Sequence, residues 1–125
     1  MRDPRLGVEW SLKRAAIRQA YGGYMSSPAW YRRRRRWLSE FRAAAGEDPV
    51  CVVCGEAWQL SRDDLHHRSY RRLGREDFGD LVPMCRTCHS RLHVLLDKNP
   101  EWHHFRHEQA TDLLISYLRK EKGNE

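Results

Sequence analysis

The sequence predicts an α+β fold, in which two short strands and one helix form a small core between flanking helices. Short apolar segments bounded by turn residues, at 57–67 and 80–85, predict the strands. An apolar pattern at helical spacing, at 86–97, predicts the helix that follows them. The third observation is a set of cysteines in two C-x-x-C pairs: Cys51, Cys54, Cys85 and Cys88.

The N-terminal segment, residues 1–46, is predicted to be a basic helical extension packed on the core. Residues 9–21 fit a short helix that ends at Gly22-Gly23. A longer helix is expected over 27–46, with Ser27 as the N-cap, Pro28 in the first turn and Gly46 at the end. Its spacing predicts a buried face made of Trp30, Trp37, Leu38, Phe41 and Ala45.

Residues 47–98 are predicted to form the core, and residues 99–125 a C-terminal helix. The first strand is expected near a turn at 61–64, and Pro83 in the second suits the edge of a sheet. Asn99-Pro100-Glu101 is typical of a helix start, and the last helix is expected to run to about Lys120. Its predicted apolar face holds Trp102, Phe105, Gln109, Leu113 and Tyr117, with Leu114 and Leu118 beside them.

The net charge of +6 is unevenly placed along the 125 residues. Residues 1–46 hold eleven Lys and Arg against three acids, whereas the rest is close to neutral. Clustered positive charge attracts nucleic acid, an acidic membrane surface or an acidic protein. No segment approaches the roughly 18 apolar residues that span a bilayer, and the N-terminus lacks a signal-peptide pattern. We therefore expect a cytoplasmic protein in a reducing compartment, with no membrane partner.

The cysteine pairs predict a structural zinc site. Without an export signal, paired C-x-x-C units favour Zn²⁺ over disulfides. Two intervening residues allow both thiolates of a pair to reach one ion at about 2.3 Å. Because 30 residues separate Cys54 from Cys85, the loop between them must contain folded structure.

Histidines inside and just after this loop predict a second metal site. His66 and His67 are adjacent, and on a regular strand they would point in opposite directions. We therefore expect the chain to bend after His66 if both serve one site. His89 and His93 lie four apart on the helix that follows Cys88, so they share one face. The pair His103 and His107 lacks cysteine or carboxylate company, and we interpret it as helix surface.

Residues 51–93, "CVVC…LHHRSYRRLGREDFGDLVPMCRTCHSRLH", closely resemble the HNH endonucleases with the ββα-metal (His-Me finger) fold. The stretch is similar in particular to zinc-stapled members that read HHxxYxxxGxE…DLxxLCxxCHxxxH. A looser likeness extends upstream to "YGGYMSSPAWYRRRRR". The resemblance implies a metal-dependent nuclease acting on DNA, and small chains of this kind resemble phage or bacterial products.

The resemblance also implies a role for each matched residue. His67 matches the general base that takes a proton from the attacking water. Asp80 stands where many relatives have Asn, and it is expected to orient His67 or to join the metal. Tyr70 and Glu76 are interpreted as supports of the loop. One catalytic divalent cation (Mg²⁺, Mn²⁺, Ni²⁺ or Zn²⁺) is expected on His66, His89 and His93.

Two classes of function follow. The first is a DNA endonuclease that nicks or cuts duplex with little sequence preference and works with a second copy of the chain or a phage or bacterial DNA-processing partner. The alternative is a non-catalytic zinc module that binds nucleic acid or protein; the four histidines together favour the enzyme. The arginine run can equally be a solvated helix face. The expected phosphate contacts are Arg32, Arg33, Arg34, Arg35, Arg36, Arg68, Arg71, Arg72 and Arg75.

Overall fold

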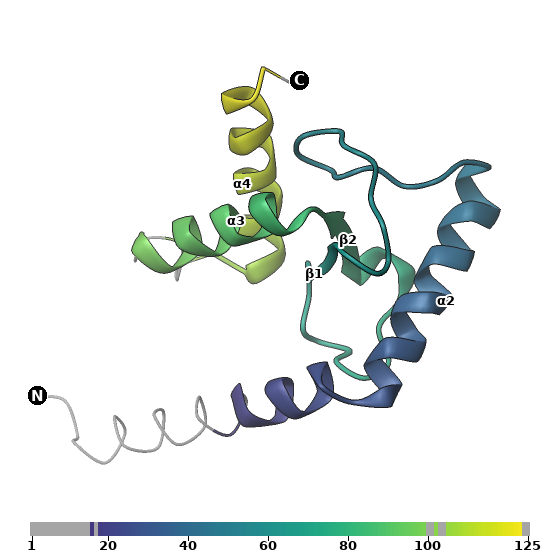
Figure 1. Cartoon of the computed structure of the whole chain (residues 1–125). Helices are drawn as coiled ribbons and strands as arrows, with labels where there is room; N and C mark the ends of the chain where they lie inside the picture. The colour runs from purple at the N-terminus through teal and green to yellow at the C-terminus, as the bar shows by residue number, and fades with distance from the viewer. Residues whose placement is uncertain (1–15, 17, 100–101, 103–104, 124–125) are drawn as a thin grey trace, which may run out of the picture.

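The computed structural model describes residues 16, 18–99, 102 and 105–123. Two antiparallel strands, β1 (Asp64–His67) and β2 (Leu81–Met84), lie between helix α2 (Pro28–Ala45) and the pair formed by α3 (Arg86–Lys98) and α4 (His107–Glu121) (Figure 1). A 3-10 turn, η1 (Phe78–Asp80), leads into β2. The predicted α+β class is confirmed. Within the described residues, no helix is both long and apolar enough to cross a membrane.

The two-stranded sheet separates two apolar clusters. In the antiparallel pair, Asp64 lies opposite Met84 and His67 lies opposite Leu81. Along each strand, successive side chains point to opposite faces of the sheet. Leu65 and Leu81 pack with Trp30 and other aromatic side chains on the α2 side. Met84 packs with the cysteines and the apolar faces of α3 and α4. The same alternation sends His66 toward α3 and His67 toward α2.

The N-terminal helices differ in detail from the sequence prediction. Residues 18–25 are helical, so the helix passes through Gly22-Gly23 instead of ending there. Each glycine costs roughly 1 kcal/mol in a helix, but the rings of Tyr21 and Tyr24 on this helix contact His67 and Trp30. Packing against the core therefore outweighs the local preference. Residues 9–15 and 17 lie outside the described residues.

Helix α2 has the predicted ends. The Ser27 hydroxyl accepts a hydrogen bond from the Trp30 N–H at 3.3 Å. Gly46 has a φ of 71° and donates its N–H to the Arg42 carbonyl at 2.9 Å. Of the predicted buried face, Trp30 and Trp37 are buried and Leu38 and Phe41 partly so, whereas Ala45 is exposed. The apolar contact thus ends one turn before the helix does.

The C-terminal helix begins later than predicted. Helix α3 ends at its C-cap, Asn99, and α4 starts at His107. The residue before α4, Arg106, donates its backbone N–H to the Gln109 side chain at 3.2 Å. Pro100 and Glu101 lie outside the described residues. The buried face of α4 also differs from the predicted one, because Leu113 and Tyr117 are about half exposed. The buried positions are Ala110, Thr111, Leu114 and Leu118.

Candidate metal centres and active site

The four cysteines come together as one cluster, with ligand sulfurs within 4.8 Å of one another. The first pair lies in a turn that Gly55 completes at a φ of 78°, and the Val52 N–H donates to the Pro83 carbonyl of β2 at 2.9 Å. Cys85 is the N-cap of α3. Sulfurs at the corners of a tetrahedron around zinc lie about 3.8 Å apart, given Zn–S bonds of about 2.3 Å. The Cys54 and Cys85 sulfurs are 3.9 Å apart, so the cluster fits zinc.

The protonation of these thiols also points to a cation. Burial and the neighbouring thiols raise the pKa of Cys88 well above its ordinary value. Burial likewise raises the pKa of Cys54, whereas at Cys51 burial is outweighed by hydrogen bonds from backbone groups, which lower the pKa. Four thiols this close cannot all ionise without a positive charge among them, whereas metal binding removes their protons outright. The cluster therefore suits a structural zinc ion.

Three imidazoles converge on a second point, between β1 and α3. The Nε2 atom of His89 lies 3.2 Å from His66 Nδ1 and 3.0 Å from His93 Nε2. Nitrogens bound to one tetrahedral ion at about 2.0 Å lie about 3.3 Å apart. When His89 Nδ1 carries the proton that it donates to Asp64, its Nε2 lone pair faces both other rings, as that of a ligand to a shared cation would. The predicted ligand set of His66, His89 and His93 is thus brought together in a geometry that fits a metal ion.

The outward nitrogens of two of these rings are held by other side chains. The Asp64 carboxylate accepts a hydrogen bond from His89 Nδ1 at 3.1 Å. The Thr111 hydroxyl lies 3.0 Å from His66 Nε2 and is fully buried. Such partners fix the tautomer, so that the other nitrogen presents its lone pair. Burial, followed by the neighbouring imidazoles, lowers the pKa of His66 to about 2, which keeps the ring neutral as a ligand must be.

His67 lies on the opposite face of β1 in an aromatic enclosure. Its ring stacks on Trp30 at 4.9 Å between centroids and on Tyr70 at 5.5 Å. The Glu76 carboxylate accepts a hydrogen bond from Nε2 at 2.7 Å, so Nε2 carries the proton. Nδ1 has no hydrogen-bond partner among the described residues and is buried. The ring therefore holds one free lone pair in a fixed orientation, as a general base requires.

Glu76 takes the place that the sequence prediction gave to Asp80. The Asp80 carboxylate accepts hydrogen bonds from the Arg72 guanidinium and from the Asp77 N–H, which lies 2.9 Å away. The hydrogen bond from Arg72 holds the pKa of Asp80 below its ordinary value. Asp80 does not belong to the histidine ligand group either. Its side chain shapes the turn before β2, whereas the contact with His67 belongs to Glu76.

Glu76 is firmly held in that position. Its second oxygen accepts a hydrogen bond from the Tyr24 hydroxyl at 2.8 Å, and Arg33 Nε donates to its backbone carbonyl at 3.0 Å. Burial alone would raise the pKa of Glu76, but the hydrogen bonds from His67 and Tyr24 hold it below the ordinary value. A charged carboxylate therefore faces the His67 ring. The expected bend after His66 is absent, because β1 keeps strand geometry through His67. Both histidines can therefore serve one phosphate only if it lies at the edge of the strand, between its two faces.

Several of the predicted DNA-binding arginines are engaged inside the molecule. Arg33 does not fit the predicted set, because it is only 5% exposed and pairs with Glu40. Arg34 donates to two backbone carbonyls, at 2.7 Å each. Arg68 forms a two-point pair with Asp112, and Arg72 pairs with Asp80. The exposed members of the set are Arg32, Arg35, Arg36, Arg71, Arg72 and Arg75, of which Arg72 is held by the Asp80 pair.

Comparison with known proteins gives a match to part of the chain. The family model described as HNH endonuclease matches residues 51–95, a span that runs from the first cysteine pair through the histidines of α3. No curated protein and no solved structure matches the chain. The matched span accounts for less than half of the residues, and both α2 and α4 lie outside it.

Two side chains from α4, outside the HNH match, complete the histidine site. One is Thr111, whose hydroxyl lies against His66. The other is His107, whose Nε2 donates to the His67 carbonyl at 2.8 Å and whose ring lies 5.4 Å from that of His66. The interpretation of His107 as helix surface is therefore wrong, and His103 lies outside the described residues. No spacing in the sequence indicates either contact, because it depends on where α4 packs.

Proposed function

We propose that this chain is a metal-dependent DNA endonuclease that nicks or cuts duplex with little sequence preference. One observation supports this more than any other. Three imidazoles converge on one point, and the next residue of the strand, His67, has a free Nδ1 and is oriented by a buried carboxylate. A purely structural zinc module does not require a buried histidine whose free Nδ1 is oriented by a carboxylate. Hydrolysis of a phosphodiester requires both a base and a cation.

His67 acts on water in this proposal. The Nδ1 lone pair accepts a proton from the attacking water, while Glu76 holds the Nε2 proton and stabilises the imidazolium that forms. The ring is 1% exposed beneath Tyr21, Trp30 and Tyr70, so water reaches Nδ1 only when one of these side chains moves. Tyr70 is 38% exposed, which makes it the side chain that arriving DNA would displace most readily.

His66, His89 and His93 would hold the catalytic cation. When bound there, a divalent ion would stabilise the negative charge that develops on the leaving 3′ oxygen. The protein contributes neutral nitrogen ligands and the partners that orient them. Three protein ligands leave open positions for substrate, as in other catalytic metal sites. The exposed arginines would contact backbone phosphates, which fix position and carry no sequence information directly.

A plasmid-nicking assay tests the proposal. Wild-type protein is incubated with supercoiled plasmid and Mg²⁺, Mn²⁺, Ni²⁺ or Zn²⁺, and EDTA is the negative control. Relaxed or linear product is expected with at least one of these ions. Intact plasmid with every ion, from protein that is folded and holds its metals, would favour the non-catalytic zinc module.

The variant His93→Ala should lose the catalytic ion and keep the structural one. Removal of a direct ligand should weaken binding by more than the roughly 10–100-fold that outer partners typically contribute. Metal analysis should therefore give two ions per chain for wild type and one for the variant, with cleavage lost in parallel. Val94→Ala, an exposed neighbour on α3, is the matched control and should behave as wild type. Two tightly held ions in His93→Ala would contradict the ligand assignment.

Thr111 should affect the same site without contacting the ion. Thr111→Val keeps the shape but removes the hydroxyl that holds His66 Nε2. We expect metal affinity to fall by about 10–100-fold, measured by Co²⁺ titration with its visible absorption bands. Thr111→Ser restores the hydroxyl and should restore both affinity and spectrum. Equal loss in the Val and Ser variants would show that Thr111 serves packing alone.

A further inference from the structure

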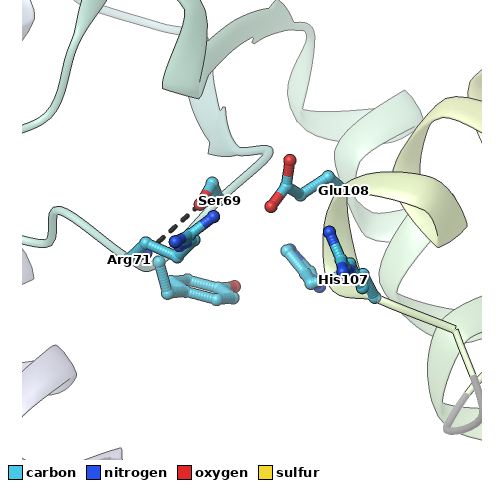
Figure 2. A pocket seen from close by; sticks show the side chains of 6 residues that line it. Ser69, Arg71, His107 and Glu108 are labelled. Carbon is cyan, nitrogen blue, oxygen red and sulfur yellow. Dashed lines mark hydrogen bonds between the residues drawn. The ribbon is translucent and has the colours of Figure 1, made fainter.

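A cavity of about 530 Å³ opens beside the histidine site, and Tyr70 and His107 of that site form part of its lining. The segment after β1 forms one wall and the first turn of α4 forms the other. Figure 2 shows Ser69 and Arg71 on one side, facing His107 and Glu108 across the opening. The six lining residues are Ser69, Tyr70, Arg71, Arg106, His107 and Glu108.

The cavity adjoins the proposed reaction centre. The His107 ring lies 4.5 Å from that of Tyr70 and 5.4 Å from that of the ligand His66. Tyr70 in turn stacks on the proposed base His67. A group bound in the cavity would therefore be separated from the reacting phosphate by a single layer of side chains. DNA that reached the histidines would therefore have a neighbouring phosphate within reach of this opening.

The charges that face the cavity remain unneutralised. Among the described residues, carboxylates pair with Arg68 and Arg72 on either side of the opening. Within the part of the chain that the structure describes, no such pair forms at Arg71, nor at Arg106 across the cavity, and both side chains are exposed. The acid in the lining, Glu108, lies 4.0 Å from Arg68. The fold therefore leaves two guanidinium groups that can meet an anion.

A buried hydroxyl adds a third polar group. Ser69 is 3% exposed, and its oxygen accepts a hydrogen bond from the Arg71 N–H at 3.2 Å. This bond fixes the oxygen at the base of the wall that carries Arg71. The hydroxyl proton can be donated to a ligand, in the manner of hydroxyls that contact phosphate. Two guanidinium groups and a hydroxyl form a combination that suits a phosphate group.

We propose that this cavity binds a backbone phosphate of the cleaved strand, next to the scissile one, through Arg71 and Arg106. The proposal rests on the endonuclease function and adds to it a substrate contact from α4, which lies outside the HNH match. The proposal also assigns different roles to the arginines of the segment that follows β1. Arg68 and Arg72 hold the structure together, whereas Arg71 binds substrate with a partner supplied by another element.

Salt dependence of DNA binding tests the contact. In a His67→Ala background, which prevents cleavage, affinity for a short duplex is measured by fluorescence anisotropy at several salt concentrations. Arg71→Gln and Arg106→Gln should each reduce the slope of log K against log[salt] by about 1. Arg91→Gln removes the same charge from α3, where it pairs with Glu121, and should leave the slope unchanged. Unchanged slopes for the cavity variants, or an equal fall for Arg91→Gln, would overturn the proposal.

A second measurement places the phosphate. Once the cut position on an oligonucleotide is mapped, single neutral methylphosphonate linkages are introduced on either side of it. One such linkage should weaken binding by the protein with both arginines but not by the Arg71→Gln, Arg106→Gln double variant. Equal weakening in both would place the arginines on other phosphates and refute the assignment. Protein that shows the expected slopes but never nicks DNA would contradict the endonuclease function and the position next to a scissile phosphate, whereas the contact of the two arginines with phosphate would stand.

Discussion

Replacing His67 by alanine is expected to abolish cleavage while DNA binding and both metal ions are retained. The structure gives this ring a single free nitrogen, Nδ1, and general-base catalysis typically contributes about 10²–10⁴-fold to a rate. The rate of plasmid nicking should fall by at least that factor. Anisotropy with a duplex and metal analysis check that the defect is chemical. Near wild-type cleavage by this variant would remove the base assignment.

Two further variants separate chemistry from packing. His67 fills a buried space against Trp30, so alanine leaves a cavity there; His67→Gln keeps an N–H for Glu76 but has no nitrogen that accepts a proton. It should be equally inactive and should melt closer to wild type. Glu76→Gln should reduce the rate more than Asp80→Asn, because only Glu76 contacts the base. The opposite order would restore the role that the sequence suggested for Asp80.

The ligands could be predicted from sequence because their spacing carries the geometry. His89 and His93 share a helix face whatever the rest of the chain does. The C-x-x-C pairs likewise determine which sulfurs can share an ion. These local constraints survive folding, so the Cys51, Cys54, Cys85 and Cys88 cluster and the three-histidine group both appear as expected.

The partners of these residues could not be predicted in the same way. Glu76 reaches His67 because the loop between them folds back, and the burial of Arg33 beneath it fixes that path. Thr111 and His107 reach the site because α4 packs on α3, which no local pattern indicates. A run of five arginines looks uniformly cationic in sequence, yet a helix must turn one of them toward the core. Tertiary packing decides these roles, whereas spacing decides the ligands.

The helix boundaries show the same difference between local interactions and tertiary packing. Ser27 and Gly46 mark the ends of α2 correctly because capping is a local interaction. Gly22-Gly23 misleads, because contacts made elsewhere in the chain decide that position. These contacts are aromatic: Tyr21 lies against His67 and Tyr24 against Trp30.

Replacing Cys85 by serine is expected to cost the protein its cooperative fold. The hydroxyl of serine is a good N-cap, so the start of α3 keeps its cap while losing a zinc ligand. Structural zinc sites contribute about 10–16 kcal/mol in zinc-finger peptides. This is comparable with the whole stability of a typical domain, about 5–15 kcal/mol. Calorimetry should therefore show no sharp unfolding transition, and zinc content should fall.

The same substitution should also empty the histidine site, although it touches none of its ligands. Cys85 and Cys88 anchor the first turn of α3, and that turn carries His89. Cys85→Ser should thus lose both ions, whereas His93→Ala loses one and still melts cooperatively. Thr87→Ala, an exposed change in the same turn, should keep both ions and the transition. If Cys85→Ser retained two ions and a melting temperature within a few degrees of wild type, the cysteine cluster would not be what positions the catalytic histidines.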